Sequence, residues 1–230
     1  MTARLVTLVF DAHDPRRLAR FWAGVLRWDA ADDGVTIVPR DGQFSIRFAP
    51  TEEPKRGPNQ MHFDLTSATY DLQQTTVARV LELGGQHLDI GQLPEEEHVV
   101  MADPEGNEFC VIEAGNNFLA DTGVIGALSS DGLQDVGYFW SAALDWPLVW
   151  DQDTETAIQS RQGGTKISWG GEPVAPKLGR NRLRLELESV DGDRQAEVDR
   201  LVALGATQVD DGSMLADPGG NEFAVVAQNT

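Results

Sequence analysis

Basic residues are scarce in this 230-residue sequence. Eighteen lysines and arginines stand against 37 aspartates and glutamates, which gives a formal net charge of −19 at pH 7. Nucleic acids are bound by basic surfaces that neutralise phosphates, and anionic membranes attract the same kind of surface. We therefore expect neither a nucleic acid nor a membrane as a partner.

Cysteine and long apolar runs are also nearly absent. Cys110 is the single cysteine, so no disulfide can form within the chain, and a reducing compartment suits it. No stretch approaches the roughly 18 apolar residues of a membrane helix, and the first residues lack the pattern of a secretory signal. Phosphate-binding glycine loops, zinc-type cysteine clusters and nucleophile elbows are missing too. These absences predict a cytoplasmic protein.

An internal repeat organises what is present. The sequence Asp103–Phe109 (DPEGNEF) returns 114 residues later as Asp217–Phe223 (DPGGNEF), with six of seven positions identical. Phe21-Trp22 returns as Phe139-Trp140, and further echoes follow in the same order. Repeats of this kind indicate duplication of a structural unit. We predict two domains, residues 1–115 and 116–230, joined at a polar turn.

Each half reads as strand, helix and further strands, twice. Arg4–Phe10 has the composition of a strand, and Asp14-Pro15 then forms a helix start. Apolar residues follow at helical spacing as far as Leu26. The pattern restarts with a strand at Met61–Thr66, a helix at Asp71–Leu83 and two strands around the Asp-Pro turn. This order predicts an α+β fold made of four βαβββ modules.

The arrangement resembles the vicinal oxygen chelate superfamily, which includes glyoxalase I, extradiol dioxygenases and bleomycin-resistance proteins. The Asp14-Pro15 helix with Phe21-Trp22, the strand holding His62, the helix closed by Leu83-Gly84-Gly85 and the Asp-Pro-x-Gly-Asn turn carry the likeness. The resemblance implies two tandem glyoxalase-like domains whose curled mixed sheets form a cleft. In glyoxalases and dioxygenases that cleft holds a divalent metal.

The metal positions of such relatives are poorly filled here. Their glutamate four residues after the glycine of the turn is replaced by Cys110 in the first half and Ala224 in the second. The strand that presents histidine offers His62 once and Arg184 at its second occurrence. A catalytic site needs three or four converging donors, and this count finds two, His62 and Cys110. We therefore expect no metal and no other cofactor.

The first half keeps more polar positions, and we predict the ligand site there. Its expected members are His62, Asp64, Arg47, Cys110, Thr7 and Trp28. Alternatives stay open for several of them. His62 is either an acid–base group or a strand histidine hydrogen-bonded within the cleft, and Cys110 is either a nucleophile or a small buried residue. Asp64 and its counterpart Glu186 either contact the ligand or pair with an arginine such as Arg47.

Tryptophan positions divide into two groups. Trp22 and Trp140 lie on helix faces and are expected in the core. Trp28, with Trp146, Trp150 and Trp169, is a candidate wall of the cleft, because small-molecule sites are mostly apolar with a few placed polar groups.

The leading hypothesis is a metal-independent, glyoxalase-like protein that binds a small organic molecule, by sequestration or with acid–base chemistry. The alternatives are a metal-dependent lyase or dioxygenase of the same superfamily, and a non-enzymatic interaction protein. Whether a reaction is catalysed stays open. For assembly, we expect a monomer with an internal pseudo-dimer, or a homodimer.

Overall fold

The computed structural model describes residues 3–40, 43–93, 95–210 and 214–228. Its helices are α1 (Pro15–Leu26), α2 (Tyr70–Glu82), α3 (Gln134–Leu144) and α4 (Arg194–Ala203). The strands of the first half are β1 (Ala3–Ala12), β2 (Asp29–Ala30), β3 (Thr36–Val38), β4 (Ser45–Pro50), β5 (Met61–Leu65), β6 (Gln86–His87), β7 (Val99–Ala102) and β8 (Glu108–Val111). Those of the second half are β9 (Ile125–Ser130), β10 (Leu148–Gln152), β11 (Glu155–Gln159), β12 (Lys166–Trp169), β13 (Leu183–Ser189), β14 (Thr207–Gln208), β15 (Met214–Ala216) and β16 (Glu222–Val226).

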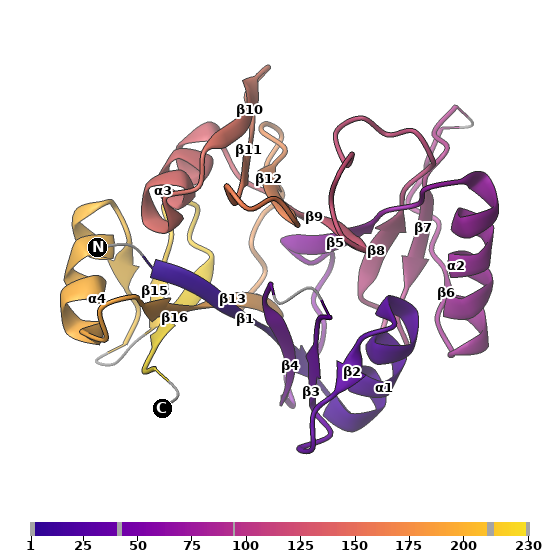
Figure 1. Cartoon of the computed structure of the whole chain (residues 1–230), viewed down its shortest axis with the longest axis horizontal. Coiled ribbons are helices and arrows are strands. Elements are labelled where there is room, and N and C mark those ends of the chain that lie inside the picture. The colour runs from indigo at the N-terminus through magenta and orange to yellow at the C-terminus, as the bar shows by residue number, and fades with distance from the viewer. Residues whose placement is uncertain (1–2, 41–42, 94, 211–213, 229–230) are drawn as a thin grey trace.

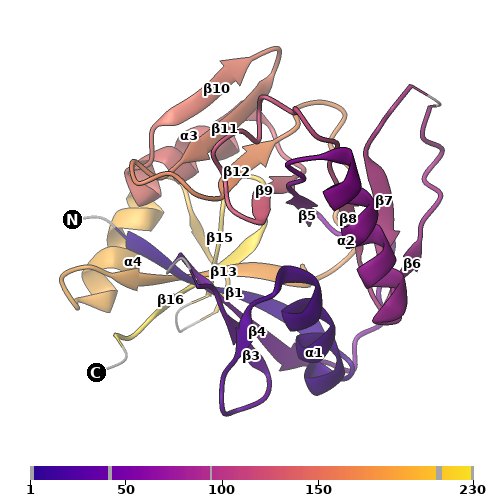
Figure 2. The same cartoon turned by 45° about the vertical axis from the view of Figure 1, so that its right-hand side comes forward.

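These elements form four βαβββ modules in two eight-stranded mixed sheets (Figure 1). Sheet A has the order β14-β15-β16-β13-β1-β4-β3-β2, and sheet B has the order β10-β11-β12-β9-β5-β8-β7-β6. The α+β fold class and the four modules are therefore confirmed. The expected strong curl is wrong, because both sheets twist but stay open (Figures 1 and 2).

Each sheet joins one module from each half of the sequence. In sheet A, β1 pairs antiparallel with β13, and in sheet B, β5 pairs antiparallel with β9. The first and last modules thus share sheet A, and the two middle modules share sheet B. The two tandem copies pair as an internal pseudo-dimer, and each sheet crosses between them.

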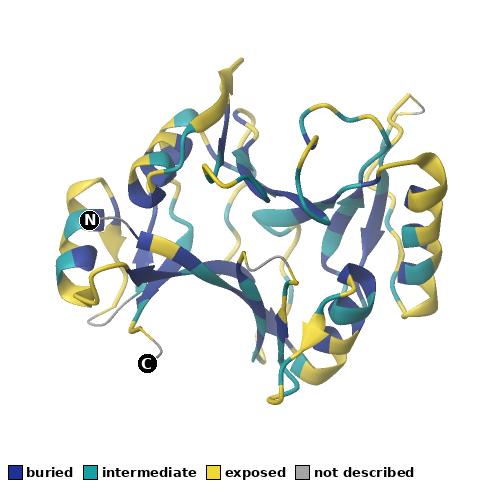
Figure 3. Cartoon of the chain, viewed as in Figure 1, coloured by how far each residue is buried: buried dark blue, intermediate teal, exposed yellow. Residues whose placement is uncertain are grey.

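Local sequence explains where α1 lies. The Asp14 side chain accepts a hydrogen bond from the Arg17 amide and caps the helix, and Pro15 occupies the first helical position. The buried face of α1 consists of Leu18, Ala19, Phe21, Trp22, Val25 and Leu26, while the outward faces of the helices are largely exposed (Figure 3). None of the helices in the described part of the chain is long and apolar enough to cross a membrane.

Each half packs its own aromatic core. The ring of Trp22 lies 4.8 Å from the rings of both Phe63 and Phe109, so α1 covers the strands of the second module. In the second half, the Trp140 ring lies 4.9 Å from Phe223. Trp22 and Trp140 are almost fully buried, which confirms both as core residues.

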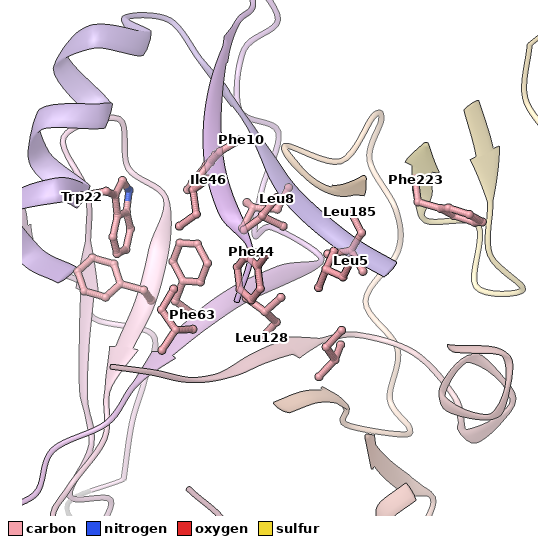
Figure 4. Close-up of a cluster of buried hydrophobic side chains, with 14 of the residues drawn as sticks. Leu5, Leu8, Phe10, Trp22, Phe44, Ile46, Phe63, Leu128, Leu185 and Phe223 are labelled. Carbon is pink, nitrogen blue, oxygen red and sulfur yellow. The ribbon is translucent and has the colours of Figure 1, made fainter. Parts of the chain in front are cut away.

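The two sheets also contact each other through their apolar faces (Figure 4). The ring of Phe10 on β1 lies 6.2 Å from that of Phe63 on β5, and Leu8 and Leu128 are fully buried beside them. Because successive side chains of a strand alternate between faces, the neighbours of these apolar residues point to the opposite face of each sheet. Polar residues that are candidates for function lie on that face.

The repeated turn closes each half. In the first half, the Trp22 indole nitrogen donates to Asp103 Oδ2 at 3.3 Å, and the Asn107 side chain donates to the same carboxylate. In the second half, the Trp140 indole nitrogen donates to Asp217 Oδ2 at 3.0 Å. The duplicated Asp and Trp are thus bonded partners, which accounts for their joint repetition.

The glutamates that follow the turn are structural as well. Glu108 Oε2 lies 2.8 Å from Lys55 Nζ, and Glu222 Oε1 lies 2.6 Å from Lys177 Nζ. Each lysine comes from the linker that leads into the following module. These two glutamates therefore anchor linkers.

Candidate functional site

A polar cluster lies on sheet B where the two halves meet. His62 and Asp64 alternate with the buried Phe63 and share the opposite face of β5. Cys110 on β8 stands opposite Asp64, and Ser129 on β9 stands opposite His62. The cluster thus combines residues that are far apart in the sequence.

Hydrogen bonds connect the members of the cluster. His62 Nε2 lies 3.5 Å from Asp64 Oδ1, and the Ser129 hydroxyl donates a short hydrogen bond to Asp64 Oδ2. Ser129 Oγ lies 3.2 Å from Ser168 Oγ on β12. The Asp64 carboxylate therefore contacts the imidazole through one oxygen and the Ser129 hydroxyl through the other, and Ser129 in turn contacts Ser168.

These contacts set the protonation of His62. Burial disfavours the charged imidazole, but hydrogen bonds to Asp64 and Cys110 and the charge of Asp64 outweigh it and raise the pKa of His62 to about 10. Burial raises the pKa of the Cys110 thiol, and the hydrogen bond to His62 opposes that shift. Asp64 thus favours the charged form of the His62 imidazole, and burial favours the neutral form of the Cys110 thiol.

A cavity of about 410 Å³ opens in front of His62. Three aromatic side chains, Phe118, Trp150 and Trp169, contribute to its wall, with Ser129, Ser168 and Asp131 as polar lining. The rings of Phe118 and Trp150 are 6.3 Å apart in an edge-to-face arrangement. We call this space the His62 cavity. Its volume and mixed lining suit a small organic molecule.

The equivalent face of sheet A has different chemistry. In sheet A, Glu186 is paired with Thr7 on one side and with Ala224 on the other. In sheet B, Asp64 is paired in the same way with Ala127 and Cys110. The positions are equivalent, but the side chains differ. Arg47 Nη2 lies 2.6 Å from Glu186 Oε1. Beside this pair is a smaller cavity of about 210 Å³, which we call the sheet A cavity.

The predicted site residues therefore do not meet at one point. His62, Asp64 and Cys110 lie together on sheet B, but Thr7 and Arg47 lie on sheet A, where Thr7 Oγ1 is 3.2 Å from Ser45 Oγ. Trp28 packs against the core, with its ring 6.4 Å from Phe44. The first half thus contributes its predicted residues to two different sheets. The functional role of each residue stays a prediction.

The pairing of modules across the halves also explains the residues that sequence reasoning missed. Ser129 and Ser168 belong to the second half, where Glu186 was a candidate but neither serine was. Trp150 and Trp169 were among the expected wall residues, and both line the His62 cavity. Knowledge of the strand order β12-β9-β5 would have placed both serines beside His62, but the sequence carries no direct signal for that order.

Of the two sites, sheet B alone fits the divalent metal that the fold family implies. His62, Asp64 and Cys110 each offer a ligand atom, and these atoms lie within 4.8 Å of one another. The sequence count of two donors omitted Asp64. On sheet A, Arg184 and Arg47 occupy the positions around Glu186, and guanidinium groups cannot act as ligands for a cation.

Comparisons with known proteins agree with this architecture. A glyoxalase-like domain family model matches residues 7–112 and again 127–226. Glyoxalase I from Zea mays superposes with a TM-score of 0.64 at 15% identity, covering 98% of this chain and 92% of the maize chain. A Bacillus subtilis protein named as a candidate dioxygenase gives 0.59 at 14% identity, covering 97% and 84%. No curated protein sequence matches this chain.

At such identities the solved structures show a common fold and nothing more. The family model, in contrast, spans most of the sequence in two consecutive copies, as the internal repeat predicts. The chain belongs to the glyoxalase-like domain family of the vicinal oxygen chelate superfamily and carries two tandem copies of the domain.

Proposed function

We propose that this protein binds a small, partly aromatic organic molecule in the His62 cavity and does so without a resident metal. The observation that carries the proposal is the combination of an aromatic wall with one polar end. Phe118 and Trp150 supply apolar surface, the largely buried Trp169 lies behind them, and the side chain of His62, one-third exposed, lines the polar end. Aromatic walls hold rings by stacking, and a few placed polar groups set orientation.

The polar end is prepared for a ligand by its own hydrogen bonds. Asp64 Oδ1 lies 3.5 Å from His62 Nε2, and the Asp64 side chain is 15% exposed. The carboxylate therefore fixes the orientation of the imidazole. An imidazolium at the cavity end donates a hydrogen bond to a ligand oxygen, such as a carbonyl, phenolate or carboxylate. Binding by this route requires no further charged group.

A metal-dependent function is the second candidate, and the proximity of three donors favours it. His62, Asp64 and Cys110 would hold the ion. A divalent ion bound there would act as a Lewis acid on a ligand oxygen. His62 lines the cavity, so a ligand near the ion would contact the same aromatic wall.

The test is a thermal-shift screen with a panel of ring-containing carboxylates, phenols and ketones. A specific ligand raises the melting temperature in proportion to its binding to the folded state. We expect Trp150→Ala to remove the shift, because Trp150 lines the cavity and is 38% exposed. Val149→Ala is the matched control, because Val149 is its neighbour on β10 and is 43% exposed. Equal shifts in both variants, or no shift with any compound, would contradict the proposal.

A further inference from the structure

Two linkers cross between the sheets and enclose a second cavity. One linker, residues 51–60, leads from β4 in sheet A to β5 in sheet B, and the other, residues 170–182, leads from β12 back to β13. Between them lies a cavity of about 380 Å³, which we call the linker groove. It shares Asp11, Thr51 and Arg180 with the sheet A cavity, so the two spaces adjoin.

Basic residues concentrate at these adjoining cavities. Six of the 18 basic residues of the chain line them, against three acidic residues, Asp11, Glu53 and Glu186; the basic residues are Arg47, Lys55, Arg56, Arg180, Arg182 and Arg184. The whole protein carries a formal charge of −19, so this composition is the reverse of the average surface. An excess of one sign of charge in a cleft favours a ligand of the opposite sign.

Ion pairs account for the buried part of this charge. Arg184 forms a two-pronged pair with Asp11, at 2.6 Å and 2.7 Å, and Arg182 Nη1 lies 3.5 Å from Glu105 Oε2. Lys55 is paired with Glu108 and Arg47 with Glu186. Arg180 has no close ion pair of its own among the described residues. Among the described residues, its nearest acidic partner is Asp11 at 3.9 Å, which Arg184 already occupies.

The exposed arginines are placed to receive a ligand. The side chain of Arg180 is 58% exposed, and that of Arg56, on the other linker, is 63% exposed and has Glu53 at 3.5 Å. Both line the linker groove. A planar guanidinium binds carboxylate or phosphate oxygens through two parallel hydrogen bonds.

The symmetry-related positions of these arginines on the two linkers are not basic. By the repeat of Asn59–Leu65 in Asn181–Leu187, the counterparts of Arg180, Arg182 and Arg184 are Pro58, Gln60 and His62, and the counterpart of Arg56 is Leu178. The lysine that anchors each linker, in contrast, is kept on both sides as Lys55 and Lys177. None of these four arginines has a basic counterpart, whereas the anchoring lysine does, so the closure of the fold does not require the exposed Arg56 and Arg180.

We propose that the linker groove binds a small organic or inorganic anion, through Arg180 and Arg56, with a carboxylate or phosphate group as the recognised chemistry. This site is separate from the His62 cavity.

The experiment is isothermal titration of the full chain at low salt with succinate, with inorganic phosphate and with the uncharged dimethyl succinate. We expect saturable binding of at least one anion and none of the diester. Arg180→Gln should weaken that binding about tenfold, which corresponds to loss of one charge-assisted contact. Arg56→Gln should also weaken it, and the tighter of the two anions identifies the recognised group.

Two controls separate this site from other effects. Arg161→Gln removes the same charge from a side chain that is 65% exposed and has Asp145 at 3.6 Å, and it should change the affinity by less than about twofold. His62→Gln should leave anion binding unchanged, so failure of the proposed function and failure of this site are distinguishable. Absence of saturable anion binding, or an equal loss in Arg161→Gln, would overturn the proposal.

Discussion

Arg47 and Glu186 form an ion pair at 2.6 Å that joins the first half of the chain to the second. Arg47 lies on β4 and Glu186 on β13, so both belong to sheet A, while the His62 cavity opens on sheet B. The expected alternative in which Glu186 pairs with Arg47 is therefore confirmed. Asp64, its counterpart, pairs instead with His62 and Ser129. The two equivalent sites have diverged in charge and in chemistry.

This divergence predicts how engineered carboxylates behave. Cys110→Glu adds a second carboxylate beside His62 and Asp64, so it should raise the affinity for Ni²⁺ or Zn²⁺ at least about tenfold. Ala224→Glu is the matched control at the equivalent position of sheet A, where Arg184 and Arg47 lie nearby, and it should gain nothing. Competition titration with a metal indicator measures both variants. Equal gains, or no gain in Cys110→Glu, would show that the donors of sheet B do not converge on one ion.

Close packing of α3 on sheet B predicts a second effect. A Cβ added at Gly137 would lie 2.1 Å from Thr156 Oγ1 and 3.1 Å from Trp169 Cε3. Both neighbours line the His62 cavity. Gly137→Ala should therefore lower the free energy of unfolding by about 1–3 kcal/mol and also weaken ligand binding.

Gly170→Ala is the control for the loss of stability, because no described heavy atom beyond its chain neighbours lies within 4 Å of the added Cβ. Urea denaturation of both variants gives the comparison. A Gly137→Ala protein as stable as the wild type would mean that α3 has room to move away from the sheet.

The buried carboxyl of the repeated turn predicts a pH dependence of stability. Burial raises the pKa of Asp103 from 3.8 to about 6, although hydrogen bonds from Asn107 and Glu105 hold it lower than burial alone would. Between pH 3.8 and about pH 6, Asp103 binds more protons in the folded state than in the unfolded state. The contribution of Asp103 is therefore fully present below pH 4 and is lost as the pH rises through 6. The change amounts to about 3 kcal/mol at most.

Urea denaturation across pH 3.5 to 7 measures this effect as the difference between wild type and Asp103→Asn, which should fall as the pH rises. Asp33→Asn is a control of opposite sign, because hydrogen bonds from Thr36 lower the pKa of the exposed Asp33. Parallel curves for wild type and Asp103→Asn would show that Asp103 titrates alike in both states.

Local signals in the sequence predicted most of the secondary structure. The cap at Asp14, the apolar spacing through Leu26 and the duplicated turns at Asp103 and Asp217 each depend on near neighbours, and the four expected helices are all present. The family resemblance then supplied the modular fold. The division of the chain at residue 115 stays a prediction, because the cores follow the halves while the sheets cross between them.

The site was harder to predict because it depends on which strands pair over long distances. His62 and Ser129 are opposite each other in sheet B although 67 residues separate them, and no periodicity within either strand encodes that register. For the same reason, the sequence did not indicate that Thr7 and Arg47 lie on sheet A and not beside His62. Trp28 is partly buried and packs against the core, and its expected place in the wall of a cleft stays a prediction.

Ligand binding before and after metal removal tests the central claim most directly. The measurement is isothermal titration of the best compound from the thermal-shift screen, using protein as purified and protein dialysed against a chelator, with elemental analysis of both. The account predicts the same Kd for the two preparations and loss of binding in Trp150→Ala. Loss of binding after dialysis, with recovery on adding Ni²⁺, Zn²⁺ or Fe²⁺ in a stoichiometric amount, would contradict it.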